Sequence, residues 1–530
     1  MTQTGKQMIG SMFSAEGSET FNAVNPATGE ILEPSYYEAT ADEVDRAFQA
    51  AEKAFWVYRQ TKPVERAAFL DKIAEKIVAL GDALIKRCHR ETGLPEARLT
   101  SERGRTVNQL KLFAEVVREG SWVEARIDTA VPDRKPLPKP GIRRMLIPLG
   151  PVGIFGAGNF PLAFSVAGGD SASALAAGCP IVVKAHPAHP GTSELVAQAI
   201  VKAAQETGMP EGVFSMVHGR STEVGTAVVN HPLTKAVGFT GSYAGGKALY
   251  DEAVRRDEPI PVYAEMGSTN PVFILPGALK ERGDSIAQNL VGSVTLGVGQ
   301  FCTNPGLVFL VKHEDSDPGI FIKKTAKILS AVPAGIMLTG KIKEAYDSGI
   351  EALTRIKGVS VAARGTKAEG GCRGVPHLLQ AAAETFIKNP RLAEEVFGPS
   401  TLVITASNKE ELINAASVLK GHLTASIQCT GKDLEDVPGL VDLLKHKVGR
   451  LIMNGFPTGV EVCPSMHHGG PFPATADLRT TSVGTAAIKR FARPLCYQDF
   501  PPGALPDALK DENPLNIFRL VNGQWTAGKI

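Results

Sequence analysis

The spacing of apolar residues predicts two helices near the amino terminus. Thr40 and Glu43 have the spacing of a capping box, and apolar residues then recur on one face as far as Trp56. A second helix is expected to start at Pro63, because proline is favoured at the first helical position. Residues 131–145, rich in Pro, Arg and Lys, are expected to form a connector or an extended arm.

After Gly150, short apolar runs alternate with helical segments, which predicts a parallel, doubly wound sheet. A second α/β series follows, so the fold class is α/β. The strands expected in the first series are 152–157, 180–185, 213–219, 235–241 and 262–267. Those of the second are 271–275, 307–311, 401–406, 423–428 and 450–454.

Composition narrows the classes of function. A chain of 530 residues predicts two or three domains. Its 57 basic and 55 acidic residues leave no excess of positive charge for nucleic acid or an anionic membrane. The least polar stretch, 161–183, contains Asp170 and several glycines and serines, so no membrane span is expected. Seven scattered cysteines without a C-x-x-C pair favour a reducing, cytoplasmic location.

Three polar residues are candidates for chemistry. Cys302 lies in the glycine-rich segment GVGQFCTNPG, where a flexible turn can display a reactive thiol, although a single cysteine is usually a small core residue. Glu265 ends an apolar strand; it is either a solvated loop carboxylate or a general base whose pKa is raised by desolvation in the ligand crevice. Asn159 in GNFP is either a turn former or an oxyanion donor.

The order of six motifs resembles that of the aldehyde dehydrogenase superfamily. These motifs are GNFP, VVKAHP, GFTGS, EMGSTNP, GQFCTNPG and EVFGP. The resemblance extends from NPATGE at 25–30 to MNGFP at 453–457. The segment KAHPAHPGTSELVAQAI is similar to two bacterial subgroups, the α-ketoglutaric semialdehyde (2,5-dioxopentanoate) dehydrogenases and the NADP-dependent fatty aldehyde dehydrogenases.

The resemblance implies a role for each candidate. The Cys302 thiolate would add to the aldehyde carbon, and Asn159 with the backbone N–H of Cys302 would hold the oxyanion of the thiohemiacetal. Hydride transfer would leave a thioester, which water activated by Glu265 would hydrolyse to a free acid. Glu265 therefore separates this chain from the phosphorylating and acyl-CoA-forming relatives.

The resemblance also implies a site for a nicotinamide dinucleotide. Gly241 and Ser242 would open a helix whose amino terminus faces the pyrophosphate, although GFTGS is also compatible with an ordinary strand–turn–helix. Lys184 matches the lysine that contacts the adenine ribose. Glu395 and Phe397 match the pair that positions the nicotinamide ribose and ring; without the family, Glu395 would be read as a surface charge.

NADP is expected as cofactor, with NAD also possible. Related NAD enzymes carry a glutamate three residues after the lysine, which would repel a 2′-phosphate, and here that position is Pro187. Arg220 is a candidate partner of the 2′-phosphate, or else a solvated loop arginine. No metal is expected. Pro187 and Pro190 interrupt any helix, so His186 and His189 would not share a helical face and suit a loop near the cofactor. His467 and His468 lie where the family has a mobile loop near the substrate.

The expected organisation has three parts. They are a dinucleotide-binding domain (1–130 and 151–270), a catalytic domain (271–480) and an oligomerisation arm (131–150 and 495–530). Edge strands of such an arm pair between subunits, so we expect a homo-oligomer and favour a homodimer.

The aldehyde is the least determined feature. Phe160 and Phe164 are expected to line the substrate tunnel, or simply to belong to the core. Resemblance favours oxidation of 2,5-dioxopentanoate to 2-oxoglutarate, and a long-chain fatty aldehyde is the alternative. A function of another class, a thiol hydrolase or acyltransferase, would need a histidine close to Cys302 and no cofactor.

Overall fold

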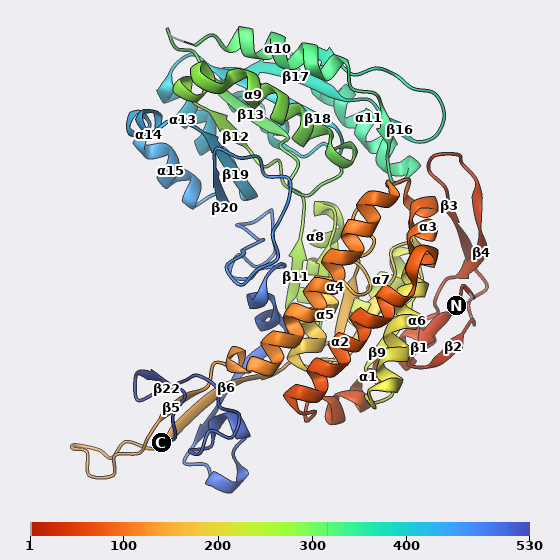
Figure 1. Cartoon of the computed structure of the whole chain (residues 1–530), viewed down its shortest axis with the longest axis vertical. Coiled ribbons are helices and arrows are strands. Elements are labelled where there is room, and N and C mark those ends of the chain that lie inside the picture. The colour runs from red at the N-terminus through yellow and green to blue at the C-terminus, as the bar shows by residue number, and fades with distance from the viewer. Residues whose placement is uncertain (1–2, 315) are drawn as a thin grey trace.

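The computed structural model describes residues 3–314 and 316–530. Two seven-stranded sheets form separate lobes, and a five-stranded sheet projects from them (Figure 1). No helix in the described ranges is long and apolar enough to cross a membrane.

The first sheet confirms all five strands predicted between 150 and 270. Its order is β11-β10-β7-β8-β9-β1-β2, with β7 to β11 parallel. The amino-terminal hairpin β1–β2 extends it antiparallel beside β9, an addition that the sequence pattern did not predict. The strands are β1 (Gln7–Ile9), β2 (Met12–Ser14), β7 (Val152–Phe155), β8 (Ile181–Lys184), β9 (Phe214–Val217), β10 (Ala236–Thr240) and β11 (Val262–Glu265).

Helices cover both faces of this sheet. The predicted capping box is confirmed at α1, where the Thr40 side chain accepts from the Glu43 N–H and the Glu43 carboxylate accepts from the Thr40 N–H. Pro63 opens α2 as expected. The helices are α1 (Ala41–Tyr58), α2 (Pro63–Ala79), α3 (Gly81–Thr92), α4 (Glu96–Glu119), α5 (Gly169–Ala177), α6 (Pro190–Glu206), α7 (Thr222–Asn230) and α8 (Tyr243–Arg255). A small hairpin of β3 (Thr20–Val24) and β4 (Ile31–Tyr37) lies outside them.

The second sheet contains the five strands predicted after 270 and two that were not predicted, β15 and β17. Its order is β15-β17-β18-β13-β12-β19-β20, and only β15 is antiparallel. The strands are β12 (Val272–Ile274), β13 (Leu307–Val311), β15 (Ser360–Arg364), β17 (His377–Ala382), β18 (Ser400–Ala406), β19 (His422–Gln428) and β20 (Val448–Met453).

The helices of the second lobe pack on both faces of this sheet and bury two apolar clusters. They are α9 (Pro276–Thr295), α10 (Pro318–Ser330), α11 (Gly340–Thr354), α12 (Ala383–Lys388), α13 (Lys409–Ser417), α14 (Gly431–Asp436) and α15 (Pro438–Lys445). A two-stranded ladder of β14 (Gly335–Ile336) and β16 (Arg373–Gly374) completes the lobe.

The projecting sheet differs in extent from the expected arm. Its order is β21-β6-β5-β22-β23, with β5 (Arg126–Asp128), β6 (Ile142–Pro148), β21 (Ala492–Gln498), β22 (Arg519–Val521) and β23 (Gln524–Thr526). Thus β5 lies before residue 131 and β21 starts before 495. Of the stretch 131–145, expected as a connector or an extended arm, only residues 142–145 belong to a strand, β6, which pairs along its whole length with β21. A pairing across more than 300 residues leaves no local sequence pattern.

The chain between β20 and β21 returns from the second lobe to the first (Figure 1). A β-bridge joins Thr475 of this segment to Glu265. The segment also accepts a hydrogen bond from the backbone N–H of Met266 and donates one to the carbonyl of Ala264. This return brings residues 466–484 onto the carboxyl end of β11.

Candidate active site

Cys302 lies in a tight turn between α9 and β13. The backbone is left-handed at Gly297 (φ 56°), Val298 (φ 60°) and Gly299 (φ 65°). A Cβ at Gly299 would lie 2.2 Å from the carbonyl oxygen of Gly398, so only glycine fits there. The φ of Val298 is strained for a β-branched residue, which fits a backbone held in place for function.

Asn270 anchors the other side of this turn. Its Nδ2 donates to the carbonyl oxygens of Cys302 (2.8 Å) and Asn304 (2.9 Å), and its own φ is 44°. The EMGSTNP segment therefore holds the cysteine backbone directly, a role that the sequence did not reveal.

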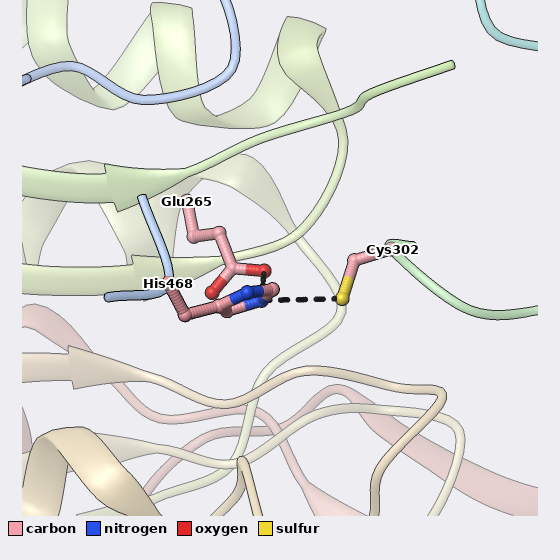
Figure 2. Close-up of side chains that lie close together, drawn as sticks. All are labelled: Glu265, Cys302 and His468. Atoms are coloured by element: carbon pink, nitrogen blue, oxygen red, sulfur yellow. Dashed lines mark hydrogen bonds and ion pairs between the residues drawn. The ribbon is translucent and has the colours of Figure 1, made fainter. Parts of the chain in front are cut away.

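Glu265 ends β11 and is buried, with 3% of its surface exposed. Its Oε1 lies 2.9 Å from Nε2 of His468, and its Oε2 accepts a 2.6 Å hydrogen bond from Ser482. The same Nε2 lies 3.5 Å from Sγ of Cys302. Figure 2 shows the three side chains converging from β11, the Cys302 turn and the returning segment.

The charge state of this cluster corrects one expectation. Burial raises the pKa of Glu265, but the charge and hydrogen bond of His468, with further hydrogen bonds from Ser482 and Cys302, outweigh burial and leave that pKa below its ordinary value. The expected raised pKa is therefore wrong, because sequence could not show these partners. Burial, followed by the nearby Glu265 charge, raises the pKa of the Cys302 thiol well above its ordinary value.

The contacts of the His468 side chain show which ring nitrogen faces Glu265. The side chain is 1% exposed, and Nδ1 has no hydrogen-bond partner among the described residues. A proton on Nε2 lets the ring donate to the Glu265 carboxylate. With the proton only on Nδ1, the lone pair of Nε2 would face the carboxylate, and the two would repel. We therefore place a proton on Nε2, which makes His468 a donor to Glu265.

Asn159 reaches the same turn from the first lobe. Its Nδ2 donates to the Gln300 carbonyl (3.0 Å), and its own carbonyl accepts from Arg98 (2.8 Å). Since a primary amide has two N–H bonds, one donor remains for an oxyanion. Phe160 and Phe164, 9% and 8% exposed, follow Asn159 in an apolar cluster that also includes Phe301. This places both rings beside the cysteine turn.

The expected pyrophosphate residues follow β10, and the expected nicotinamide residues precede β18. Ser242 is the N-cap of α8, where its Oγ accepts from the Gly245 N–H (3.2 Å), and the Gly241 N–H donates to the carbonyl of Glu265. Glu395 and Phe397 line a small cavity on the β18 side. Glu395 is exposed, yet desolvation by the protein atoms around its carboxyl raises its pKa to about 7.

Lys184 is the last residue of β8, and Arg220 follows the neighbouring strand β9. Burial lowers the pKa of Lys184 to about 8. Arg220 is exposed. Between them lies Glu38, whose carboxylate accepts from the backbone N–H of Arg220 (2.6 Å) and of Ser221 (3.3 Å). A carboxylate therefore lies at this end of the sheet, although the position where related NAD enzymes carry a glutamate is Pro187 in this chain.

Comparison with known proteins identifies the family, since the aldehyde dehydrogenase family matches residues 13–471. The chain belongs to the aldehyde dehydrogenase family. It is 51% identical over 99% of its length to an Azospirillum brasilense protein named alpha-ketoglutaric semialdehyde dehydrogenase 2, covering 100% of that chain. It is 48% identical over 98% of its length to the alpha-ketoglutaric semialdehyde dehydrogenase of Acinetobacter baylyi, covering 99% of that chain.

Solved structures agree on the fold. An aldehyde dehydrogenase from Bacillus cereus superposes with a TM-score of 0.78 at 24% identity, covering 94% of this chain and 96% of that one. A betaine aldehyde dehydrogenase from Staphylococcus aureus in complex with NAD+ superposes with a TM-score of 0.79 at 19% identity, with the same coverage. This chain is therefore an aldehyde-oxidising enzyme of a family that binds NAD or NADP.

In this aldehyde dehydrogenase, sequence reasoning missed His468 and Glu38. Two adjacent histidines before GGPFP were the only signal for His468, and nothing local marked Glu38. Among the described residues, Glu265, Cys302 and His468 form one group whose ligand atoms lie within 4.8 Å of one another, a spacing compatible with a metal ion. His186 and His189 instead stack with ring centroids 5.2 Å apart, and His189 contacts the Ala157 carbonyl.

Proposed function

We propose that the chain oxidises 2,5-dioxopentanoate (α-ketoglutaric semialdehyde) to 2-oxoglutarate. The observation that carries this substrate is the 51% and 48% identity, over almost the whole chain, to two proteins named for that reaction. The three-part division expected from the sequence is kept in this proposal, with the arm extended to include β5 and the start of β21, and with the active site between the two lobes.

The proposed chemistry starts with Cys302. Because burial disfavours a free thiolate, the Cys302 proton passes to the ionised Glu265 carboxylate, which is within hydrogen-bonding range of the thiol, as the sulfur bonds to the aldehyde carbon. The resulting oxyanion accepts hydrogen bonds from the free Asn159 N–H and the Cys302 backbone N–H. Hydride acceptance is the chemistry that a bound nicotinamide would supply, and the thiohemiacetal becomes a thioester.

Hydrolysis completes the proposed cycle. Glu265 releases its first proton to solvent and takes another from water as the hydroxide adds to the thioester carbon. The C–S bond then breaks, the acid leaves, and the proton on Glu265 returns to the Cys302 sulfur. His468 and Ser482 hold the two carboxylate oxygens of Glu265 during these steps. His468 is thus a positioning residue for the base.

For the cofactor we propose NADP, with NAD also accepted. The residues fit a dinucleotide: Lys184 is desolvated and forms no ion pair within the described ranges, and the Arg220 side chain is exposed and unpaired there. Lys184 would hold the ribose and Arg220 the 2′-phosphate. Glu38 opposes the phosphate by its charge and explains why NAD is still accepted.

Two alternatives have support of their own. The apolar cluster around Phe160 and Phe164 would also suit a fatty aldehyde. A thiol hydrolase requires a histidine close to Cys302, and His468 is such a residue. A hydrolase would work without NAD or NADP, so dependence on the cofactor separates the two classes.

We also propose a homodimer that forms through the projecting sheet. Its edge strands are β21 and β23. Large apolar side chains on or near this sheet are exposed, among them Leu137 (69%), Phe518 (58%) and Trp525 (62%). Burial of such side chains favours association. Sedimentation equilibrium of the full chain tests the proposal, and a monomer at micromolar concentration would contradict it.

The enzymatic proposal is tested with a panel of aldehydes and both cofactors. 2,5-Dioxopentanoate, pentanal and a long-chain alkanal are each mixed with NAD or NADP, and nicotinamide reduction is followed by absorbance. The highest kcat/KM is expected for 2,5-dioxopentanoate with NADP. Cys302→Ala should abolish the signal, and a higher kcat/KM for the alkanal would overturn the substrate.

A further inference from the structure

Arg105 lies on the face of α4 that looks toward the cysteine turn. Its guanidinium carbon lies 5.1 Å from the ring centroid of Phe164 and 5.8 Å from that of Phe160. Cys302 and Glu265 are close enough to interact with it electrostatically. A cation therefore stands among the aromatic rings expected to line the approach to the thiol.

The donors of Arg105 are not used by the protein. Within the described residues it forms no ion pair, and its Nε and Nη2 are buried without a hydrogen-bond partner. Glu102 and Glu461 act on it only through their charge. Burying unmade charged hydrogen bonds costs free energy, and a ligand that accepts them recovers it.

Two other arginines near the site are already engaged. Arg98 donates to the Asn159 carbonyl, and Arg450 donates to the carbonyls of Pro457 and Gly459. Each therefore holds backbone in place. Arg98 and Arg450 each keep one buried guanidinium nitrogen without a partner, whereas Arg105 keeps two, Nε and Nη2, and no protein acceptor contacts either of them in the described part of the chain.

The orientation suits a carboxylate. Aromatic rings interact with the flat face of a guanidinium, which leaves its in-plane N–H groups for a two-pronged contact with a carboxylate. In 2,5-dioxopentanoate the carboxylate and aldehyde carbons are four bonds apart, about 5 Å at ~1.5 Å per bond. Such a short molecule can reach a cation in the immediate surroundings of Cys302.

We infer that Arg105 binds the distal carboxylate of the aldehyde substrate and so selects short ω-carboxylated aldehydes over uncharged ones. The inference rests on the proposed function and adds the residue that recognises the carboxylate of the substrate. Arg105 does no chemistry on the aldehyde carbon: it places that carbon at the sulfur of Cys302 by holding the other end of the molecule.

The test compares three aldehydes of five carbons: 2,5-dioxopentanoate, 5-oxopentanoate and pentanal. Arg105→Met should lower kcat/KM for both carboxylates about 100-fold, mainly through KM, because a charged hydrogen-bonded pair is lost. Pentanal should change less than about threefold, which also shows that the variant folds. Arg105→Lys should recover part of the lost kcat/KM, because lysine keeps the positive charge but contacts the carboxylate at a single point.

Arg103→Met is the matched control, since it removes an arginine of the same helix that donates instead to the Gly81 carbonyl. It should leave the ratio of carboxylate to pentanal activity unchanged. If Arg105→Met also leaves that ratio unchanged while the wild type prefers the carboxylates, the inference on Arg105 is wrong and the proposed function stands. If the wild type oxidises pentanal but neither carboxylate, both are wrong.

Discussion

The hydrogen bond from His468 to Glu265 makes a prediction about the pH dependence of catalysis. His468→Leu replaces the imidazole with an apolar side chain and leaves Glu265 buried. Without the charge and hydrogen bond of His468, burial dominates and the pKa of Glu265 rises. Catalysis that needs the ionised carboxylate is present above this pKa and is lost as pH falls through it, so the variant should lose activity at a higher pH.

The size of the effect follows from the contact that is lost. A hydrogen bond to a charged group contributes about 1.5–3 kcal/mol, and ~1.4 kcal/mol corresponds to one pH unit. The acid limb of kcat/KM should therefore move up by about one to two pH units. The bond is 2.9 Å long between side chains that are 1% and 3% exposed, so solvent screens it little.

The assay is the pH profile of kcat/KM from pH 5 to 9 for the wild type and three variants. His468→Gln keeps an N–H donor and should restore part of the acid limb. His467→Leu is the matched control, because the neighbouring histidine forms no hydrogen bond to this cluster in the described residues. Identical acid limbs for His468→Leu and the wild type would refute the assigned role of His468.

Three further predictions concern the other proposed roles. Glu265→Gln should slow both the reduction of the cofactor in the first turnover and the hydrolysis of the thioester, since the carboxylate is the base in both steps; stopped-flow absorbance checks this, and wild-type rates in both phases would contradict it. Asn159→Ala should lower kcat by about 10²–10³-fold, the usual effect of losing an oxyanion donor, and a change confined to KM would argue against that role. Glu38→Gln should raise, and Arg220→Ala lower, the ratio of kcat/KM for NADP to that for NAD; two unchanged ratios would remove both residues from the 2′-phosphate site.

Local pattern was enough for much of the architecture. The ten strands predicted after Gly150 are all present, because each is a short apolar run bounded by polar or glycine residues. The capping box at Thr40 and the start of α2 at Pro63 are equally local signals. Some elements were not predicted, because their stability comes from neighbours distant in sequence. They are the hairpin β1–β2, the partner of β6 and the strands β15 and β17.

The candidate site divides in the same way. Cys302, Glu265 and Asn159 were found because each lies in a motif whose composition and order are visible along the chain. His468 is 203 residues from Glu265, and Glu38 is 182 residues from Arg220. Such contacts leave no periodicity along the chain, so a histidine expected in a mobile loop near the substrate could not be recognised as a hydrogen-bond partner of Glu265.

The sequence by itself determined the α/β class, the family and the identity of the proposed nucleophile, base and oxyanion donor. Only the tertiary structure decided how these groups are charged and what surrounds them. The pKa of Glu265 is the plainest case: burial alone would raise it, and His468 and Ser482, brought to β11 by the returning segment, lower it instead. The electrostatics of a site depend on distances through space, and the fold alone sets those distances.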